Sequence, residues 1–304
     1  MTPWRATLRG MAAMSFAVAA FTVNDALTKL AGLPTGETMA IRSAIAGLLI
    51  GVVIVAGGLA RDLPLLFNRA VVARTLGDVA ATILYLVALF QIPLSNALTI
   101  VQVTPLAITA TAALFLREHV GWRRWSAVGA GFLGVLIVVR PGLSGFQAAS
   151  LLTLLSVAGI TIRDLATRAM PPLLSGLLVT FAAAVASAVA GLGLGLVEAW
   201  HLPSPATFGE IVGSAIGLSL GHIFIIVAMR NGEMSAVAPF RYVAIPLAIV
   251  IGFFVWGDVP DVFTLIGTGL IIAAGIYTFA RERLLAKRGA IIERAALAQP
   301  YDTL

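Results

Sequence analysis

The hydrophobic residues of this chain form ten long continuous runs, separated by glycine, proline and charged residues. An α-helix needs about 20 apolar residues to cross the ~30 Å hydrocarbon core of a bilayer, and each run approaches that length. The period-two alternation of a membrane β-barrel is absent. We therefore predict an all-α integral membrane protein. The predicted transmembrane helices cover residues 11–31, 37–58, 70–91, 94–117, 123–140, 150–170, 174–197, 209–230, 234–256 and 262–281.

The composition agrees with a membrane protein and excludes several other classes. Of the 304 residues, 60% are hydrophobic and 11% are charged, whereas soluble domains carry roughly 25% charged residues. The mean hydropathy of +1.01 argues against a soluble enzyme, a disordered chain or a nucleic-acid-binding protein. The net charge of +6 is not gathered into a basic patch. Because the chain has no cysteine, disulfides, thiol catalysis and thiolate metal sites are excluded.

The basic residues predict the orientation in the membrane. Arg5 and Arg9 precede the first run, but that run is about 20 residues long and lacks a small-residue cleavage site, so we expect a retained helix rather than a signal peptide. Arginine and lysine are concentrated in the loops on one side of the membrane. The positive-inside rule then places both termini in the cytoplasm. We expect the bacterial inner membrane as the location.

The two halves of the chain resemble each other. Residues 22–29 and 161–168 share Thr, Asp and Thr at corresponding positions. Further along, Pro105 corresponds to Pro246 within the fourth and ninth runs. Each half holds five predicted helices, and an odd number inserts the second copy in the opposite sense. This predicts two inverted five-helix repeats, residues 1–145 and 146–281, around a central cavity, followed by a basic cytoplasmic tail of residues 282–304.

These features resemble the drug/metabolite transporter superfamily, in its ten-helix branch with two EamA-type halves. The resemblance is carried by Pro105 with Gly129-x-Gly131-x-x-Gly134 and by Pro246 with Gly267-x-Gly269. Bacterial amino-acid exporters, including the aromatic type, look most similar. The resemblance implies a basket of ten helices whose central cavity is lined by helices 1–4 and 6–9. Helices 5 and 10 would lie at the periphery.

Charged residues inside membrane helices are costly and point to function. Asp25 and Lys29 are four residues apart, as are Asp164 and Arg168, so each pair could bond within its helix. They are either mutually neutralising pairs or gates at opposite mouths of the protein. The same spacing favours a salt bridge between Arg74 and Asp78, near the end of the third helix.

Other polar residues fall near the middle of the predicted helices. Each could instead form a helix–helix hydrogen bond. Arg42 either reaches the membrane surface or offers a cation to a substrate carboxylate at the cavity mouth. Together they predict a substrate-binding cavity lined by Arg42, Tyr85, Gln102, His222, Arg241 and Tyr242.

Pro105 and Pro246 each remove a backbone hydrogen bond, so we expect them to bend their helices, either as hinges or as static kinks. No nucleophile–His–acid arrangement, HExxH motif or P-loop occurs. We therefore expect no catalytic residue, no metal and no cofactor. The expected partners are a small-molecule substrate and membrane lipid, with no nucleic acid, and a monomer is expected.

The sequence thus predicts a secondary transporter that exports small metabolites, amino acids first among them, by alternating access. A drug, nucleotide or other metabolite exporter is an alternative with the same fold. An intramembrane lipid-modifying enzyme is an alternative from a different class, which the missing catalytic motif disfavours. Because Asp25, Asp78 and Asp164 each have a basic residue four positions away, we expect proton coupling to be weak or absent.

Overall fold

The computed structural model describes residues 3–115, 121–142, 146–171, 174–230 and 237–297. Within these ranges the chain is helical and contains no strand. Ten helical spans are long and apolar enough to cross a membrane, which confirms the predicted fold class of a multi-pass membrane protein. The elements are α1 (Pro3–Ala31), α2 (Thr35–Ala56), η1 (Leu59–Phe67), α3 (Arg69–Leu89), α4 (Leu94–Val101), α5 (Thr104–Phe115), α6 (Trp122–Val139), α7 (Ala149–Arg168), α8 (Gly176–Leu194), α9 (Pro205–Arg230), η2 (Ala238–Val243), α11 (Ala244–Trp256) and α12 (Val262–Leu297).

The fourth and ninth spans are both broken, and a proline follows each break. In the fourth span, α4 ends at Val101 and α5 begins at Thr104. Pro105 has no N–H to donate to the Val101 carbonyl, as a continuous helix would require. The Thr104 hydroxyl donates to that carbonyl instead, at 2.6 Å. In the ninth span the 3₁₀ segment η2 gives way to α11 shortly before Pro246, so the interruptions fall at corresponding places in the two halves.

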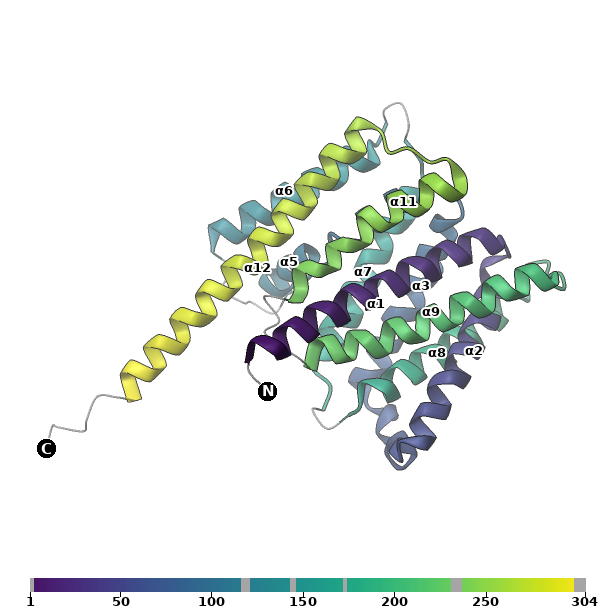
Figure 1. Ribbon diagram of the computed structural model, residues 1–304, viewed down its shortest axis with the longest axis horizontal. Coiled ribbons are helices and arrows are strands. Elements are labelled where there is room, and N and C mark those ends of the chain that lie inside the picture. Colours follow the sequence, from purple (N-terminus) through teal and green to yellow (C-terminus); the bar gives the residue numbers. More distant parts are fainter. Residues whose placement is uncertain (1–2, 116–120, 143–145, 172–173, 231–236, 298–304) are drawn as a thin grey trace, which may run out of the picture.

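The helices pair across the two halves of the chain. The main contacts join α1 to α9, α3 to α7, α2 to α8 and α6 to α12. In span order these are first with eighth, third with sixth, second with seventh and fifth with tenth. If each span of the first half is exchanged with its counterpart five spans later, the pair of first and eighth spans becomes the pair of sixth and third spans. The pair of second and seventh spans and the pair of fifth and tenth spans are unchanged. Such pairing is the one expected of inverted repeats. Figure 1 shows α6 and α12 side by side at one end of the bundle, with α2 and α8 away from them.

Reciprocal glycines let these pairs approach closely. A Cβ atom on Gly77 would lie 3.0 Å from the Gly159 carbonyl oxygen, and one on Gly159 would lie 2.9 Å from the Gly77 oxygen. Between α6 and α12, Gly134 and Gly267 are related in the same way, at 2.8 and 2.6 Å. Both glycines belong to the motifs that carry the family resemblance. Their role in the structure is backbone contact between helices, as is usual for small residues in membrane bundles.

An ion pair joins the ends of α6 and α12. The Arg140 guanidinium contacts the Asp261 carboxylate, and its carbon lies 5.2 Å from the centre of the Phe263 ring. Asp261 also accepts a hydrogen bond from the Thr264 backbone N–H, at 2.8 Å, at the start of α12. Burial tends to raise the pKa of the Asp261 carboxyl, but the Thr264 N–H and Arg140 outweigh it and lower that pKa below its ordinary value.

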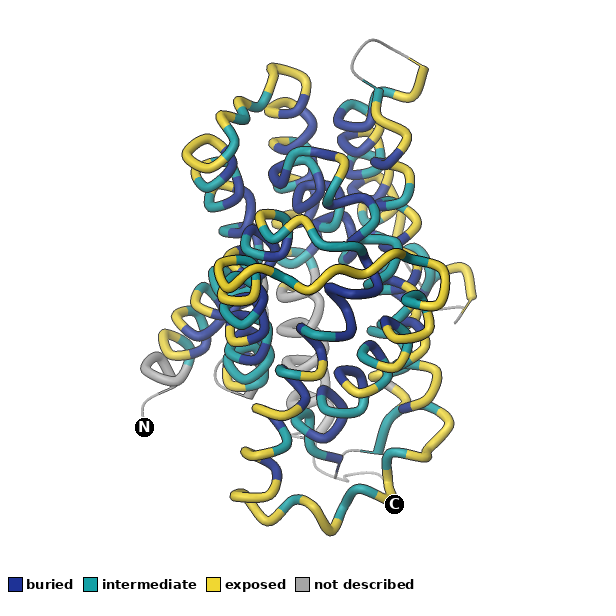
Figure 2. Tube along the Cα trace, turned by 90° about the vertical axis from the view of Figure 1, so that its right-hand side faces the viewer, coloured by how far each residue is buried: buried dark blue, intermediate teal, exposed yellow. Residues whose placement is uncertain are grey.

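Figure 2 shows how buried and exposed positions alternate along the helices. Many of the exposed positions carry large apolar side chains. Leu48, Val55 and Phe254 are among these exposed side chains, and a lipid environment suits them. At the other end of the chain, α12 continues past the tenth span to Leu297, so residues 282–297 prolong that helix (Figure 1).

Candidate functional site

Two clusters of polar and charged side chains lie where the two halves meet. The first, called here the Asp25 cluster, is formed by Asn24, Asp25, Thr28, Arg42, Tyr85 and Ser214, on α1, α2, α3 and α9. Asp25 is only 8% exposed. Its carboxylate accepts from the Tyr85 hydroxyl and from the Asn24 side-chain amide, both at 2.8 Å. Two neutral donors on different helices therefore hold this buried carboxylate.

A relay of neutral groups connects Asp25 with Arg42. The Ser214 hydroxyl donates to the Asn24 side-chain oxygen at 2.8 Å and lies 2.7 Å from the Thr28 hydroxyl. The Arg42 guanidinium donates to that Thr28 hydroxyl, at a long 3.4 Å. Arg42 is 4% exposed, so it does not reach the surface of the bundle. Its Nε atom has no hydrogen-bond partner, and within the described residues no ion pair joins it to Asp25.

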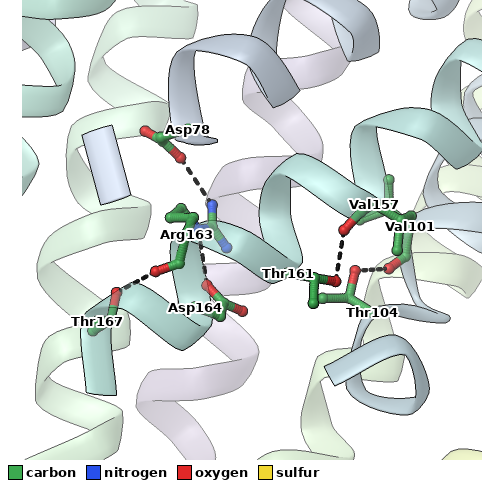
Figure 3. A network of polar contacts seen from close by, with 8 residues as sticks. All are labelled: Asp78, Val101, Thr104, Val157, Thr161, Arg163, Asp164 and Thr167. Carbon is green, nitrogen blue, oxygen red and sulfur yellow. Dashed lines mark hydrogen bonds and ion pairs between the residues drawn. The ribbon is translucent and has the colours of Figure 1, made fainter. Parts of the chain in front are cut away.

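The second cluster, called here the Arg163 cluster, is centred on α7. Arg163 bonds Asp78 of α3 at 3.1 Å and Asp164 of its own helix at 2.8 Å, as Figure 3 shows. The Arg163 carbonyl accepts from the Thr167 hydroxyl at 2.7 Å. The three charged side chains are only 16–28% exposed. One guanidinium is therefore shared by two carboxylates, and both of its ion pairs are direct.

Three further groups act electrostatically on the Arg163 cluster. Arg74 lies close enough to Asp78, and Arg241 close enough to Asp164, for their charges to interact. His222 lies close enough to Asp78 for the same interaction when its ring is protonated. The His222 ring nitrogen Nδ1 lies 2.8 Å from the Leu218 carbonyl of its own helix. We count Arg74, His222 and Arg241 as members of the Arg163 cluster.

The breaks in the fourth and ninth spans touch each other. The Gln102 side chain at the α4–α5 break donates to the Arg241 carbonyl in η2, at 2.6 Å. The Arg241 carbonyl also accepts from the Ala244 backbone N–H three residues further on, as in a 3₁₀ turn, so Gln102 adds a second donor from the other half. Gln102 and Arg241 therefore couple the broken spans of the two halves.

The structure places most of the predicted binding residues in or beside these clusters. Arg42 and Tyr85 belong to the Asp25 cluster, and His222 and Arg241 belong to the Arg163 cluster. Gln102 lies beside the Arg163 cluster, because it bonds the backbone carbonyl of Arg241. Tyr242 lies elsewhere. It packs in an apolar core with residues of α6 and α12, and its hydroxyl lies where a Cβ atom of Gly275 would be. That hydroxyl is buried without a hydrogen-bond partner.

Among the described side chains, neither the expected Asp25–Lys29 bond nor the expected Arg74–Asp78 bond forms. Lys29 does not bond Asp25. It donates to the Ile92 carbonyl, and its ammonium lies 5.4 Å from the centre of a Trp256 ring. Asp164 bonds its neighbour Arg163, and the side chain of Arg168 lies outside the described residues. Asp78 likewise bonds Arg163 on α7, and one buried nitrogen of Arg74 has no hydrogen-bond partner.

A cavity of about 680 Å³ opens at the face where α1 ends and α2 begins. Its lining residues are Lys29, Gly32, Leu33, Pro34, Thr35, Val87, Phe90, Gln91 and Trp256. Lys29 lies about one helical turn, roughly 6 Å, beyond Asp25 along α1. We call this cavity the vestibule. Its lining includes Lys29, one turn from Asp25, but no residue of the Asp25 cluster itself.

The residues predicted to line the binding cavity did not include Asn24, Thr28, Asp78, Arg163 or Ser214. Asn24 and Thr28 are four residues apart on α1, which could have indicated a polar face. Their partner Ser214 comes from α9, and nothing in the local sequence indicates that contact. Among the described residues, no group of three or more His, Asp or Glu side chains could hold a metal ion.

The fold and these buried charges define a class, that of multi-pass membrane proteins with polar clusters between the two halves of the chain. Residues 6–140 match the EamA-like transporter family. The match supports the drug/metabolite transporter superfamily that the sequence features indicated. A solved crystal structure with 17% sequence identity has a TM-score of 0.61 and covers 91% of this chain and 98% of that chain. At that identity it supports the fold alone.

Curated relatives point to the same superfamily. The chain is 27% identical to a riboflavin transporter of Rhizobium johnstonii, over 65% of this chain and 66% of the relative. It is 25% identical to an S-adenosylmethionine uptake transporter of Rickettsia felis, over 63% of this chain and 65% of the relative. The alignments thus span just under two thirds of these relatives. A pseudopaline exporter of Pseudomonas aeruginosa is 29% identical over 84% of this chain and 90% of the relative. None of these three names is that of an amino-acid exporter, so that part of the resemblance stays a prediction.

Proposed function

We propose that this protein is a secondary transporter that moves small polar or amphipathic metabolites, amino acids first among them, out of the bacterial cell across the inner membrane. The observation that supports it is the location of its buried charges. Both clusters draw side chains from both halves, and inverted-repeat transporters bind their substrates at this interface. Ionisable groups inside a membrane bundle commonly mark substrate pathways.

Alternating access is the mechanism that this arrangement supports best. The vestibule at Lys29 opens to one face of the membrane, whereas the nearby Asp25 cluster is buried. The broken fourth and ninth spans offer interruptions at matching places in the two halves. Rocking one half against the other about these breaks would close the vestibule and expose the clusters to the opposite face. In this proposal both termini lie in the cytoplasm, as the positive-inside rule predicts.

The relatives support a metabolite rather than an inorganic ion as substrate. Their names specify riboflavin, S-adenosylmethionine and pseudopaline. S-adenosylmethionine bears an ammonium and a carboxylate on one carbon, as amino acids do, which favours the amino-acid class. The riboflavin transporter favours a larger aromatic metabolite as a second candidate.

Transport is tested with purified protein in liposomes, by uptake of radiolabelled amino acids, riboflavin and S-adenosylmethionine. Flux above that of empty liposomes is expected for at least one amino acid. No flux of any solute would refute transport, whereas flux of riboflavin alone would favour the second candidate.

Alternating access is tested by thiol labelling, because the chain has no cysteine of its own. Val87→Cys places a thiol in the vestibule, and Leu202→Cys, which is 99% exposed at a loop position, serves as the matched control. A transported solute should slow labelling at position 87 by a membrane-impermeant reagent and leave position 202 unchanged. Equal labelling at position 87 with and without that solute would count against alternating access.

A further inference from the structure

We infer that Arg42 and Asp25 form a divided site for the head group of a zwitterionic substrate. The Arg42 guanidinium binds the substrate carboxylate, and the Asp25 carboxylate binds the substrate ammonium. The inference rests on the proposed transport function and names the chemical class that the site selects.

Arg42 has hydrogen-bonding capacity that the protein leaves unused. A guanidinium offers five N–H donors in a planar fork, which suits a carboxylate with two oxygens. Among the described residues its one hydrogen bond is the long bond to Thr28, and its Nε is unpartnered although Arg42 is only 4% exposed. A buried charge so poorly bonded is costly. An incoming carboxylate would satisfy it.

Asp25 has unused capacity of the opposite kind. An ionised carboxylate can accept about four hydrogen bonds. Tyr85 and Asn24 supply one each, and both are neutral. These donors hold the carboxylate in place and leave its charge uncompensated by direct contact. An ammonium group, with three donors and a positive charge, complements it.

The protein keeps these two opposite charges apart. They act on each other electrostatically, yet Thr28, Ser214 and Asn24 form the hydrogen-bonded path between them. In the Arg163 cluster, by contrast, the guanidinium bonds both neighbouring carboxylates directly. Arg163 is thus paired directly with carboxylates, whereas Arg42 and Asp25 each keep hydrogen-bonding capacity that a zwitterion could fill.

A zwitterion satisfies both sites at once, and a singly charged molecule does not. A carboxylic acid without an amine would bond Arg42 but leave Asp25 uncompensated. An amine without a carboxylate would bond Asp25 and leave Arg42 uncompensated. A site built to bond a group rejects analogues that lack it far more strongly than an apolar pocket rejects a missing methylene. The predicted selectivity therefore concerns the head group rather than the side chain of the substrate.

The test measures binding to the full-length protein in lipid nanodiscs by calorimetry. The probes are L-phenylalanine and L-leucine, with phenethylamine and 3-phenylpropanoate as analogues that lack one charge. Wild-type protein should bind an amino acid about 100-fold more tightly than either analogue. Arg42→Gln should reverse the preference toward phenethylamine, and Asp25→Asn should reverse it toward 3-phenylpropanoate. Arg61→Gln, at an exposed position of η1, should keep the wild-type order.

A merely structural role for Arg42 and Asp25 would weaken all probes together without reversing their order. That result, or equal binding of amino acids and analogues by wild-type protein, would overturn the inference. So would a protein that transports another solute and binds neither amino acid. If Arg42→Gln does not fold, Arg42→Lys keeps the charge but loses the planar fork, and it should weaken binding while preserving the order. Absence of flux for every solute would instead refute transport itself.

Discussion

Replacing Arg163 with glutamine tests whether the Arg163 cluster is held together by its ion pairs. The substitution removes the direct partner of two carboxylates, at 3.1 Å from Asp78 and 2.8 Å from Asp164. Removing one member of a buried ion pair costs about 3–5 kcal/mol, because the remaining charge stays buried. Since these side chains keep 16–28% of their exposure, water offsets part of that cost. We expect a loss in the free energy of unfolding near the lower limit, about 3 kcal/mol.

A double-mutant cycle measures the interaction free energy between Asp78 and Arg163. Asp78→Asn removes the other charge, so the combination of Asp78→Asn and Arg163→Gln should cost less than the sum of the single changes. Groups in one network typically show coupling energies of about 0.5–3 kcal/mol. Arg163 divides its ion pairing between Asp78 and Asp164. We therefore expect a coupling energy between Asp78 and Arg163 of about 1–2 kcal/mol, below the upper limit of that range.

The measurement is unfolding in mixed micelles by titration with a denaturing detergent, followed by circular dichroism. Arg61→Gln on exposed η1 is the control and should change stability by less than about 0.5 kcal/mol. Two results would refute the reasoning. One is additivity of the two changes within about 0.5 kcal/mol, which is typical of independent sites. The other is a single Arg163→Gln effect no larger than that of the control.

Three further predictions concern packing, the broken spans and pH. Gly159→Ala should lower the free energy of unfolding by about 1–3 kcal/mol through overpacking. Gly193→Ala is the control and should not, because no atom lies within 4 Å of its added Cβ. Equal effects of the two changes on the melting temperature would contradict this prediction. Pro105→Ala or Pro246→Ala should slow liposome transport and leave the protein folded, and unchanged flux with both replaced would show static kinks. Because its folded pKa lies below its unfolded value, Asp261 contributes stability that is complete above the ordinary carboxyl pKa of about 4 and is lost as the pH falls through the folded pKa. Wild-type protein should therefore lose more melting temperature below about pH 4 than Asp261→Asn does, and parallel pH profiles would exclude that contribution.

The spans could be predicted because their signal is local. A run of about 20 apolar residues identifies a membrane helix whatever its neighbours are. The interruption near Pro105 is local as well, since a missing N–H acts within one helical turn. The hydrogen bond that links this break to the ninth span could not be predicted locally. Gln102 donates to the Arg241 carbonyl, which comes from the other half of the chain.

The bonds inside the site could not be predicted, because spacing along one helix proposes only partners on that helix. Asp25 and Lys29 have the spacing of an intrahelical pair. Asp25 instead accepts from Tyr85 on α3, and Lys29 donates to the Ile92 carbonyl beyond the end of α3. Tyr242 shows the same limit. Its neighbour Arg241 joins the Arg163 cluster, while Tyr242 itself packs toward α12, because consecutive helical residues point in different directions.

The changed partners also alter the argument about proton coupling. The four-residue spacing predicts a basic partner on the same helix for Asp25, Asp78 and Asp164 alike. In the structure Asp78 and Asp164 do contact a cation, Arg163, so their charges are fixed by direct ion pairs. Among the described residues, the Asp25 carboxylate accepts hydrogen bonds from the neutral Tyr85 and Asn24 side chains and forms no ion pair. A proton carrier must exchange its proton during the cycle, which a carboxylate bonded to a permanent cation does poorly. Of these three carboxylates, Asp25 is therefore the one that could release and rebind a proton. It is also the carboxylate that we assign to the substrate ammonium, so proton and substrate would compete for one site.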